Sequence, residues 1–376
     1  MIYLDYNATT PIDENVYRAM QPYFKGHYGN PSNSYELGVK SKQAVEAARQ
    51  QVADLIGANG SEITFTSCGS ESNNTVIKGV AYTLRSKGTH IITSSIEHPS
   101  ILAPLSFLSK NGFKVTYLPV DIKGAVNPDD LSKAINEKTI LVTIMHSNNE
   151  VGTLQPIEEL GKICREKGVL FHTDASQSIG KVDIDVTQLS VDFLTMAGHK
   201  FYAPKGIGAL YIREGITIEP LLHGASQEKG IRAGTENVAY TVALGEAAVQ
   251  AKIHLKRGKL QGIRDYFYNK LKDAFGENIV LNGDEKNRLP NTLNVSFIGK
   301  IGGNILSTLS EICASTGSAC HSGSKTISPV MAAMGVDEET ALGAIRFSVG
   351  RYTTKEEIDK AISLLKNISL PNHSSF

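Results

Sequence analysis

Short apolar runs and longer stretches with helical spacing alternate along the first 240 residues. The apolar runs predict strands at 63–66, 90–93, 114–118, 140–145, 169–173, 193–197 and 208–212. Apolar residues at helical spacing predict helices at 41–56, 71–84, from residue 99, 128–135 and 157–166. Strands that alternate with helices indicate an α/β fold with a mainly parallel sheet and crossover helices.

The pattern changes after about residue 237. A long helical stretch at 238–275 is followed by expected strands at 291–297 and 343–349, with helices near 304–311 and 355–365. This pattern predicts a second, smaller α+β domain at the C-terminal end. We place a large domain at 15–250 and a small domain at 1–14 together with 251–376.

Composition narrows the class of protein. Hydrophobic residues make up 41% and charged residues 20% of 376 residues, as in globular proteins. Lys+Arg and Asp+Glu both total 38, so the whole chain has no net attraction to nucleic acid. The N-terminus lacks the features of a signal peptide, and no apolar run is long enough to cross a bilayer. We therefore expect a cytoplasmic protein that binds neither nucleic acid nor membranes directly.

Four cysteines occur, at Cys68, Cys164, Cys313 and Cys320. They form no CxxC motif, their spacings do not suit a zinc site, and they are too sparse for a disulfide framework. Cys320 stands in a Gly/Ser-rich stretch, where a thiolate could reach a substrate. The alternative is a passive exposed thiol. The other three adjoin apolar or helical segments and are expected to pack in the interior.

Three local patterns are candidates for chemistry. Gly69 and Ser70 stand where a strand gives way to a helix, a turn that favours phosphate, although many such turns bind nothing. Asp174 follows an apolar strand, at the edge where open α/β sheets bind ligands, or it simply caps the next helix. Lys200 follows another strand among small residues, where loss of solvation would free its amine as a nucleophile. A solvated surface lysine is the alternative.

Taken together and in order, the motifs resemble the cysteine desulfurase family, within the aminotransferase class V group of fold-type I pyridoxal-phosphate enzymes. The resemblance extends from Tyr3 to the end of the last expected helix. Its motifs are Tyr3–Pro11, Gly29–Ser32, Glu71–Asn74, Glu97-His98, Asn148–Gly152, Asp174–Gln177, Gly198–Lys200, Pro204–Gly206, Arg232–Thr235, Leu289–Thr292, Gly317–Cys320 and Ile345-Arg346.

The resemblance implies a role for each matching residue. Lys200 would bind the cofactor and move the substrate Cα proton, and Asp174 would keep the cofactor's ring nitrogen protonated. His98 would stack on the ring, and Gln177 would reach the ring hydroxyl. The remaining cofactor contacts would be Gly69, Ser70 and His199 at the phosphate, Asn149 near the ring oxygen, and Thr235 from the second subunit of a homodimer.

The resemblance also implies the substrate and reaction. Arg346 would bind the carboxylate of L-cysteine, assisted by Asn149, with Asn7, Ala8 and Thr9 lining the entrance. The Cys320 thiolate would take the sulfur as a persulfide, release alanine and pass the sulfur to acceptor proteins. Iron–sulfur cluster assembly and tRNA thiolation are the processes this branch serves.

The chain departs from the family pattern at several positions. Ala197 replaces a usual Ser, Ser70 a usual Thr, Cys68 a common Gly, and Tyr35 a frequent His. Further changes are Ala225, Ser226 and Lys229, and the sequence Cys320-His321-Ser322. The sequence Cys320-His321-Ser322 resembles that of selenocysteine lyases and DNA-phosphorothioation desulfurases. A selenocysteine lyase and a sulfur donor for DNA phosphorothioation therefore remain alternative functions. A class V transaminase, which needs no thiol, and a catalytically silent scaffold are less well matched.

Overall fold

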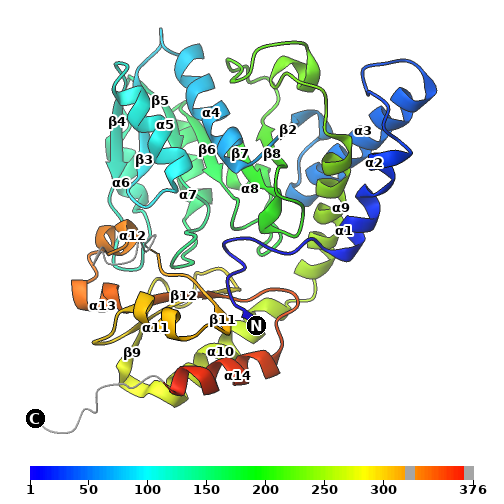
Figure 1. The fold of residues 1–376 in the computed structure, drawn as a ribbon. Coiled ribbons are helices and arrows are strands. Elements are labelled where there is room, and N and C mark those ends of the chain that lie inside the picture. The colour runs from blue at the N-terminus through cyan, green and yellow to red at the C-terminus, as the bar shows by residue number, and fades with distance from the viewer. Residues whose placement is uncertain (318–326, 368–376) are drawn as a thin grey trace, which may run out of the picture.

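The computed structural model describes residues 1–317 and 327–367 and consists of two bodies, drawn above and below one another in Figure 1. The upper body contains a seven-stranded sheet in the order β2-β8-β7-β6-β5-β3-β4. These strands are β2 (Ile63–Thr66), β3 (His90–Ser94), β4 (Lys114–Leu118), β5 (Thr139–Thr143), β6 (Leu170–Asp174), β7 (Phe193–Ala197) and β8 (Gly208–Ile212).

The sheet is mainly parallel, which confirms the predicted α/β fold. Neighbours from β7 through β6, β5 and β3 to β4 pair in parallel, whereas β8 runs antiparallel to both β7 and β2. Crossover helices connect the parallel strands, as the alternating sequence pattern requires. The carboxyl ends of β3, β5, β6 and β7 therefore lie on one edge, where ligands of such sheets bind.

Helices cover both faces of the sheet, and consecutive strand residues point to opposite faces, so neighbouring residues enter different cores. Ile91, Leu141 and Phe193 pack with helices α4 and α5, whereas Ile92, Val142 and Leu194 pack in a different core with α3, α7 and α9. The helices of this body are α1 (Glu14–Met20), α2 (Pro22–Lys25), α3 (Glu36–Ile56), α4 (Gly69–Thr83), α5 (Pro99–Ser109), α6 (Pro128–Ala134), α7 (Ile157–Glu166), α8 (Val186–Leu189) and α9 (Val238–Leu255).

The expected helical stretch at 238–275 is two helices. The first, α9, ends at Leu255, and α10 (Lys259–Phe275) begins after Gly258, which has a left-handed backbone with φ of 58°. Glycine adopts this conformation at little cost, so the chain turns there and leaves the upper body. Apolar spacing continues across the turn, and for that reason the pattern alone does not reveal the break.

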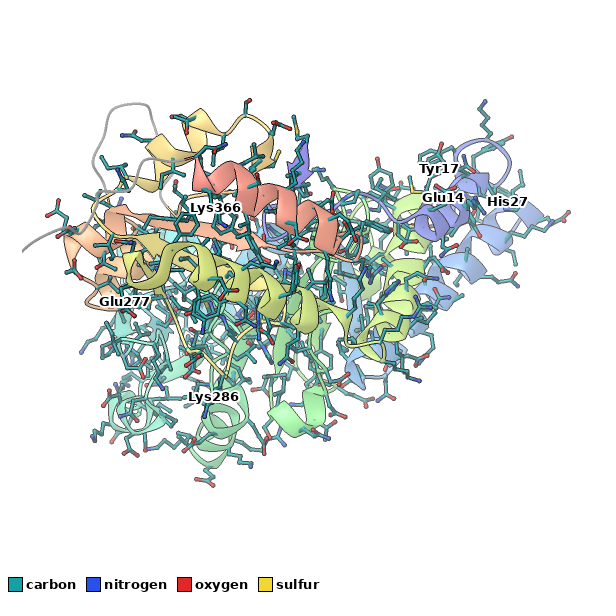
Figure 2. The ribbon with its side chains drawn as sticks, turned by 90° about the horizontal axis from the view of Figure 1, so that it is seen from below. Glu14, Tyr17, His27, Glu277, Lys286 and Lys366 are labelled. Atoms are coloured by element: carbon teal, nitrogen blue, oxygen red, sulfur yellow. The ribbon has the colours of Figure 1, made fainter. Side chains whose placement is uncertain are left out.

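The lower body has its own apolar core. A three-stranded antiparallel sheet, in the order β12-β10-β9, packs on α10 and α14, which Figure 2 shows side by side with Lys366 at the end of α14. The N-terminal strand β1 (Ile2–Tyr3) pairs in parallel with β11 (Ile312–Cys313). The other elements are β9 (Ile279–Leu281), β10 (Thr292–Phe297), β12 (Ala344–Ser348), α11 (Gly302–Thr308), α12 (Pro329–Ala333), α13 (Glu338–Leu342) and α14 (Lys355–Lys366).

The N-terminal segment connects the two bodies. After β1 it passes Ser348 of β12, whose backbone carbonyl accepts from the Tyr6 N–H at 3.3 Å. It then reaches the upper body, where the Thr10 N–H donates to the His199 carbonyl at 2.9 Å. Residues 5–10 thus lie at the junction, next to the sheet edge described above. The domain boundary at 250/251 stays a prediction.

Candidate active site

A cavity of about 360 Å³ opens at the carboxyl ends of the strands. Most of the predicted site residues line it, although they come from seven separate segments of the chain. The lining residues are Asn7, Cys68, Gly69, Ser70, His98, Ser100, Met145, Ser147, Asn149, Asp174, Ser176, Gln177, Ala197, His199, Lys200 and Arg346.

Asp174 is the last residue of β6 and is buried, with 8% of its surface exposed. Its carboxylate accepts from the Asn73 side-chain amide at 2.8 Å and from the Ser176 N–H at 2.9 Å. The same Asn73 amide nitrogen donates to the Ser100 hydroxyl at 2.8 Å. Buried carboxylates need such donors, and these hold the Asp174 oxygens at fixed positions in the cavity wall.

His98 caps the N-terminus of α5. Its Nδ1 accepts from the Ser100 N–H at 3.1 Å and lies 2.8 Å from the Ser100 hydroxyl. Burial lowers the pKa of His98, despite the opposing effect of Asp174. The ring is therefore neutral at pH 7, with its proton on Nε2. We call the group formed by Asn73, His98, Ser100 and Asp174 the strand-end wall.

The turn at Gly69 begins the 15-residue helix α4. A side chain at Gly69 would place its Cβ 3.1 Å from the Ser176 hydroxyl and 3.3 Å from the Ala197 Cβ, closer than most real contacts. Glycine leaves this space open, beside the free N–H groups of the first helical turn. Cys68 also lines the cavity and is half-buried, so it is not the interior packing residue that we expected.

Lys200 ends the 3₁₀ turn Gly198–Lys200 that follows β7. Its amine donates to the Asn7 carbonyl at 2.7 Å and to the Ala8 carbonyl at 2.8 Å. Burial, followed by the charge of Arg346, lowers the pKa of Lys200 to about 8. Burial, followed by the charges of nearby lysines, lowers the pKa of His199 to about 4. A large fraction of Lys200 is thus neutral near pH 8, as a nucleophilic amine requires.

Gln177 and Asn7 are joined by a second lysine. The Gln177 amide nitrogen donates to the Asn7 carbonyl at 2.9 Å, and Lys181 donates to the Gln177 side-chain oxygen at 2.9 Å. Lys181 also donates to the Asn7 side-chain oxygen at 3.3 Å. This network holds the N-terminal segment against the edge of the sheet that lines the cavity.

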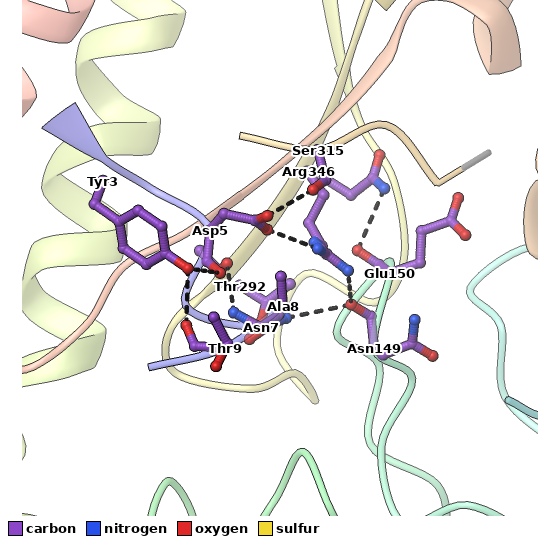
Figure 3. Close-up of polar contacts among 12 residues, drawn as sticks. Tyr3, Asp5, Asn7, Ala8, Thr9, Asn149, Glu150, Thr292, Ser315 and Arg346 are labelled. Atoms are coloured by element: carbon purple, nitrogen blue, oxygen red, sulfur yellow. Dashed lines mark hydrogen bonds and ion pairs between the residues drawn. The ribbon is translucent and has the colours of Figure 1, made fainter. Parts of the chain in front are cut away.

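Arg346, on β12, lies in a second wall of the cavity, and Figure 3 shows its contacts there. Its guanidinium donates to the Asp5 carboxylate at 2.7 Å and to the Asn149 carbonyl at 3.0 Å. The other Asp5 oxygen accepts from the Ser315 hydroxyl at 2.7 Å, and the Asn7 amide donates to the Asn149 carbonyl at 3.3 Å. We call Asp5, Asn7, Asn149 and Arg346 the N-terminal wall.

Comparison with known proteins agrees with this geometry. The family model of aminotransferase class V matches residues 2–361. The chain belongs to this family. A protein of Dictyoglomus turgidum named cysteine desulfurase IscS is 49% identical over 371 residues, which cover 98% of this chain and 94% of that protein. These matches confirm the predicted resemblance to the cysteine desulfurases.

Solved structures agree as well. One titled NifS-like protein is 39% identical, with a TM-score of 0.91, and covers 97% of this chain and 98% of its own. Another, titled SspA in complex with cysteine, is 38% identical with a TM-score of 0.83, over 94% of this chain and all of that one.

The chain is a pyridoxal-phosphate enzyme by its family, and the residues of the cavity fit that cofactor. The open space at Gly69 and the helix N-terminus suit a phosphate, a desolvated amine suits an aldehyde, and a buried carboxylate suits a pyridinium nitrogen. In the described parts of the chain, no group of three or more metal-ligating side chains occurs, and no helix has the length and apolar character needed to cross a membrane.

Among the described residues, three with an expected role do not line the cavity: Thr235, which is exposed, and Ala8 and Thr9, which were expected at its entrance. Cys320 lies outside the described residues, so its predicted role stays a prediction. Of the remaining cysteines, Cys164 is buried, and burial raises its pKa to about 12, whereas Cys313 is half-buried on β11.

Three polar residues that hold the site, Asn73, Asp5 and Lys181, have no role assigned from the sequence alone. Asn73 follows Gly69 by one helical turn, so the spacing of the predicted helix could have placed it on the same face. No comparable local signal exists for Asp5 or Lys181. Asp5 meets Arg346 across 341 residues of chain, and Lys181 is followed by an ordinary turn.

Proposed function

We propose that this protein converts L-cysteine to L-alanine and passes the sulfur, carried as a persulfide on Cys320, to acceptor proteins. The observation that carries the proposal is the meeting of Lys200, Asp174 and Arg346 in one cavity. These supply a partly neutral amine, a buried carboxylate and a guanidinium for the substrate carboxylate. Relatives named cysteine desulfurase along almost the whole chain support the same activity.

Each wall of the cavity has a separate task in this proposal. Arg346 binds the substrate carboxylate and is already oriented by Asp5 and Asn149. Asp174 would keep the ring nitrogen of the cofactor protonated, and the neutral His98 ring would stack on the cofactor. Gly69, Ser70 and His199 would hold the phosphate, and Gln177 and Asn149 would hold the ring oxygen. Pyridoxal phosphate, when bound, supplies an electron sink for the pair left at the substrate Cα.

Lys200 then acts as the base. Once the substrate occupies its place, the neutral amine removes the Cα proton and returns a proton to the substrate. The Cys320 thiolate attacks the substrate sulfur, so that an S–S bond forms and the Cβ–S bond breaks. The electron pair of the broken bond stays on the three-carbon fragment, which is protonated and leaves as alanine. The persulfide sulfur is afterwards taken by a thiol of an acceptor.

We further propose that two copies of the chain form the working enzyme. Thr235 is exposed in its own subunit and lies outside the cavity, which supports a contact with the cofactor of a second copy. The acceptors we propose are proteins of iron–sulfur cluster assembly or tRNA thiolation. A reducing cytoplasm would keep Cys320 free for this transfer.

The decisive test replaces Cys320. Cys320→Ser should keep the bound cofactor and bind cysteine but form no alanine, because a hydroxyl is a far weaker nucleophile toward sulfur than a thiolate. Cys68→Ser, Cys164→Ser and Cys313→Ser are the matched controls and should keep turnover. The measurement is mass spectrometry after brief exposure to cysteine without reductant, with alanine assayed in parallel.

A sulfur adduct on the peptide containing Cys320, absent from Cys320→Ser, would support the proposal. Wild-type alanine formation in that variant, or an adduct on Cys68 instead, would contradict it. Selenocysteine should be assayed alongside. If Cys320→Ser still released selenium while cysteine turnover was low in the wild type, the protein would be a selenocysteine lyase.

A further inference from the structure

A second and larger cavity, of about 520 Å³, lies between the two bodies. Its walls come from the N-terminal segment, the turn after Gln177, the break between α9 and α10, and the segments around Pro290 and Val349. Among the described residues, Lys200 alone lines both this cavity and the one that fits the cofactor. The two spaces are thus separate compartments on either side of that lysine.

The walls of this cavity are strongly cationic. In the described parts of the chain, six basic side chains besides His254 line it, and the single carboxylate among the lining residues is that of Asp183, which is exposed. The six are Lys181, Lys200, Arg257, Lys259, Arg288 and Arg351. So many like charges around one space create a positive potential that attracts an anion.

The buried cations of this cavity lack matching negative charge. Arg288 is 4% exposed, and its guanidinium donates to two backbone carbonyls, of Val151 at 2.7 Å and Asn282 at 3.2 Å. Among the described residues its Nε and Nη1 have no hydrogen-bond partner, and no carboxylate forms an ion pair with it. A buried charge without a counter-charge is costly, and burial lowers the pKa of Arg288 to about 10.

Arg351 and Lys181 repeat this arrangement. Arg351 is stacked on the Tyr202 ring at 4.1 Å, and its ion pair with Asp13 is 3.6 Å long. Lys181 bonds only the neutral side-chain oxygens of Gln177 and Asn7 within the described chain. Burial, followed by the charges of Lys200 and Arg346, lowers its pKa well below the usual value. Of these three cations, only Arg351 has a carboxylate partner among the described residues, and that partner is Asp13.

We propose that this interdomain cavity is a binding site for a small organic anion bearing a carboxylate or phosphate group. The oxyanion would lie among Arg288, Arg351 and Lys181 and supply the missing negative charge. The apolar part would contact the non-polar residues that also line the cavity, which include Tyr6, Val182, Tyr202, Leu260 and Val349. The site is independent of the proposed desulfurase activity. Because Lys181 also holds Gln177 and Asn7, an anion here touches the wall of the cofactor cavity.

The test is calorimetric titration of the holoenzyme with inorganic phosphate and, separately, with malonate, at ionic strength matched with chloride. In the holoenzyme the bound cofactor occupies the phosphate position of the first cavity. We expect saturable binding of one anion per chain. Arg288→Met should weaken it roughly tenfold or more, because a charged hydrogen-bonding partner is lost. Arg165→Met, an exposed arginine on α7 that does not line the cavity, should bind like the wild type.

A second variant, Lys259→Gln, keeps the test possible if Arg288→Met does not fold. Lys259 is exposed at the mouth of the cavity, so Lys259→Gln should fold normally and bind several-fold more weakly. Binding of phosphate alone would identify a phosphate-bearing ligand, and binding of malonate alone a carboxylate. The proposal is overturned if neither probe binds the wild type, or if the folded variants among Arg288→Met and Lys259→Gln bind as tightly as Arg165→Met.

Discussion

The two walls of the catalytic cavity are built in different ways. The strand-end wall takes its residues from the ends of β3 and β6 and the helices beside them, and short bonds of 2.8 Å join Asp174 to Asn73 and Asn73 to Ser100. The N-terminal wall joins residues as far apart as Asp5 and Arg346, and it exists only where the lower body meets the sheet. A rigid sheet edge thus faces a wall whose geometry depends on how two bodies pack.

This difference separates cofactor binding from substrate binding. Groups on the sheet edge keep their positions whatever the lower body does, as is needed to orient a cofactor permanently. Arg346 of the N-terminal wall comes with the lower body, so a small change in packing would move it relative to Asn149, which follows β5 of the upper body. We therefore expect variants of the strand-end wall to lower the rate of chemistry, and variants of the N-terminal wall to alter substrate affinity.

The largest effect is expected at Lys200, which lines the cavity with both walls and donates to the Asn7 and Ala8 carbonyls. Lys200→Ala should lose turnover by on the order of 10⁴-fold or more, as removal of a nucleophile commonly does. The purified protein should also lack the visible absorption of covalently bound cofactor. Lys205→Ala, an exposed lysine nearby, is the control. A coloured and active Lys200→Ala protein would rule out this assignment.

Asp174→Asn tests the strand-end wall. The variant should fold and bind the cofactor more weakly, because an amide cannot hold a proton on the ring nitrogen. Loss of one such electrostatic stabiliser typically costs on the order of 10²-fold or more in rate. Exchange of the substrate Cα proton, followed by NMR in heavy water, measures the affected step directly. An exchange rate equal to that of the wild type would refute the role.

Arg346→Lys tests the N-terminal wall. A lysine keeps the charge beside Asp5 but loses the planar fork that also reaches Asn149. KM for cysteine should rise by about tenfold, while kcat stays within a few-fold, because one charged hydrogen bond to the substrate is lost. Steady-state kinetics with the cofactor absorption as a control would show this. A fall in kcat at unchanged KM would place Arg346 with the strand-end wall and remove the distinction.

The difference between the two walls also explains which site residues could be predicted from the sequence. Asp174, Lys200 and Gly69 adjoin strand ends, so local patterns of apolar runs and small residues placed them at one edge of a parallel sheet. The break at Gly258 and the pairing of Asp5 with Arg346 had no such signal. The pairing depends on contact between distant segments, which apolar spacing along the chain does not encode, and the break is hidden because apolar spacing continues across the turn. The resemblance to a known family, rather than periodicity, indicated Arg346.

The smallest expected effect concerns the pH dependence of cofactor binding, where the two walls meet at Lys200. Burial and the charge of Arg346 lower the pKa of Lys200 to about 8, and only the neutral amine reacts with an aldehyde. The rate at which apoenzyme takes up pyridoxal phosphate should therefore rise about fivefold from pH 7 to pH 8 and level off above pH 9. Stopped-flow absorbance measures it. In Arg346→Gln the positive neighbour is gone, so the pKa of Lys200 should rise and the whole curve should move to higher pH. A curve that stays in place would mean that the N-terminal wall has no electrostatic influence on the lysine.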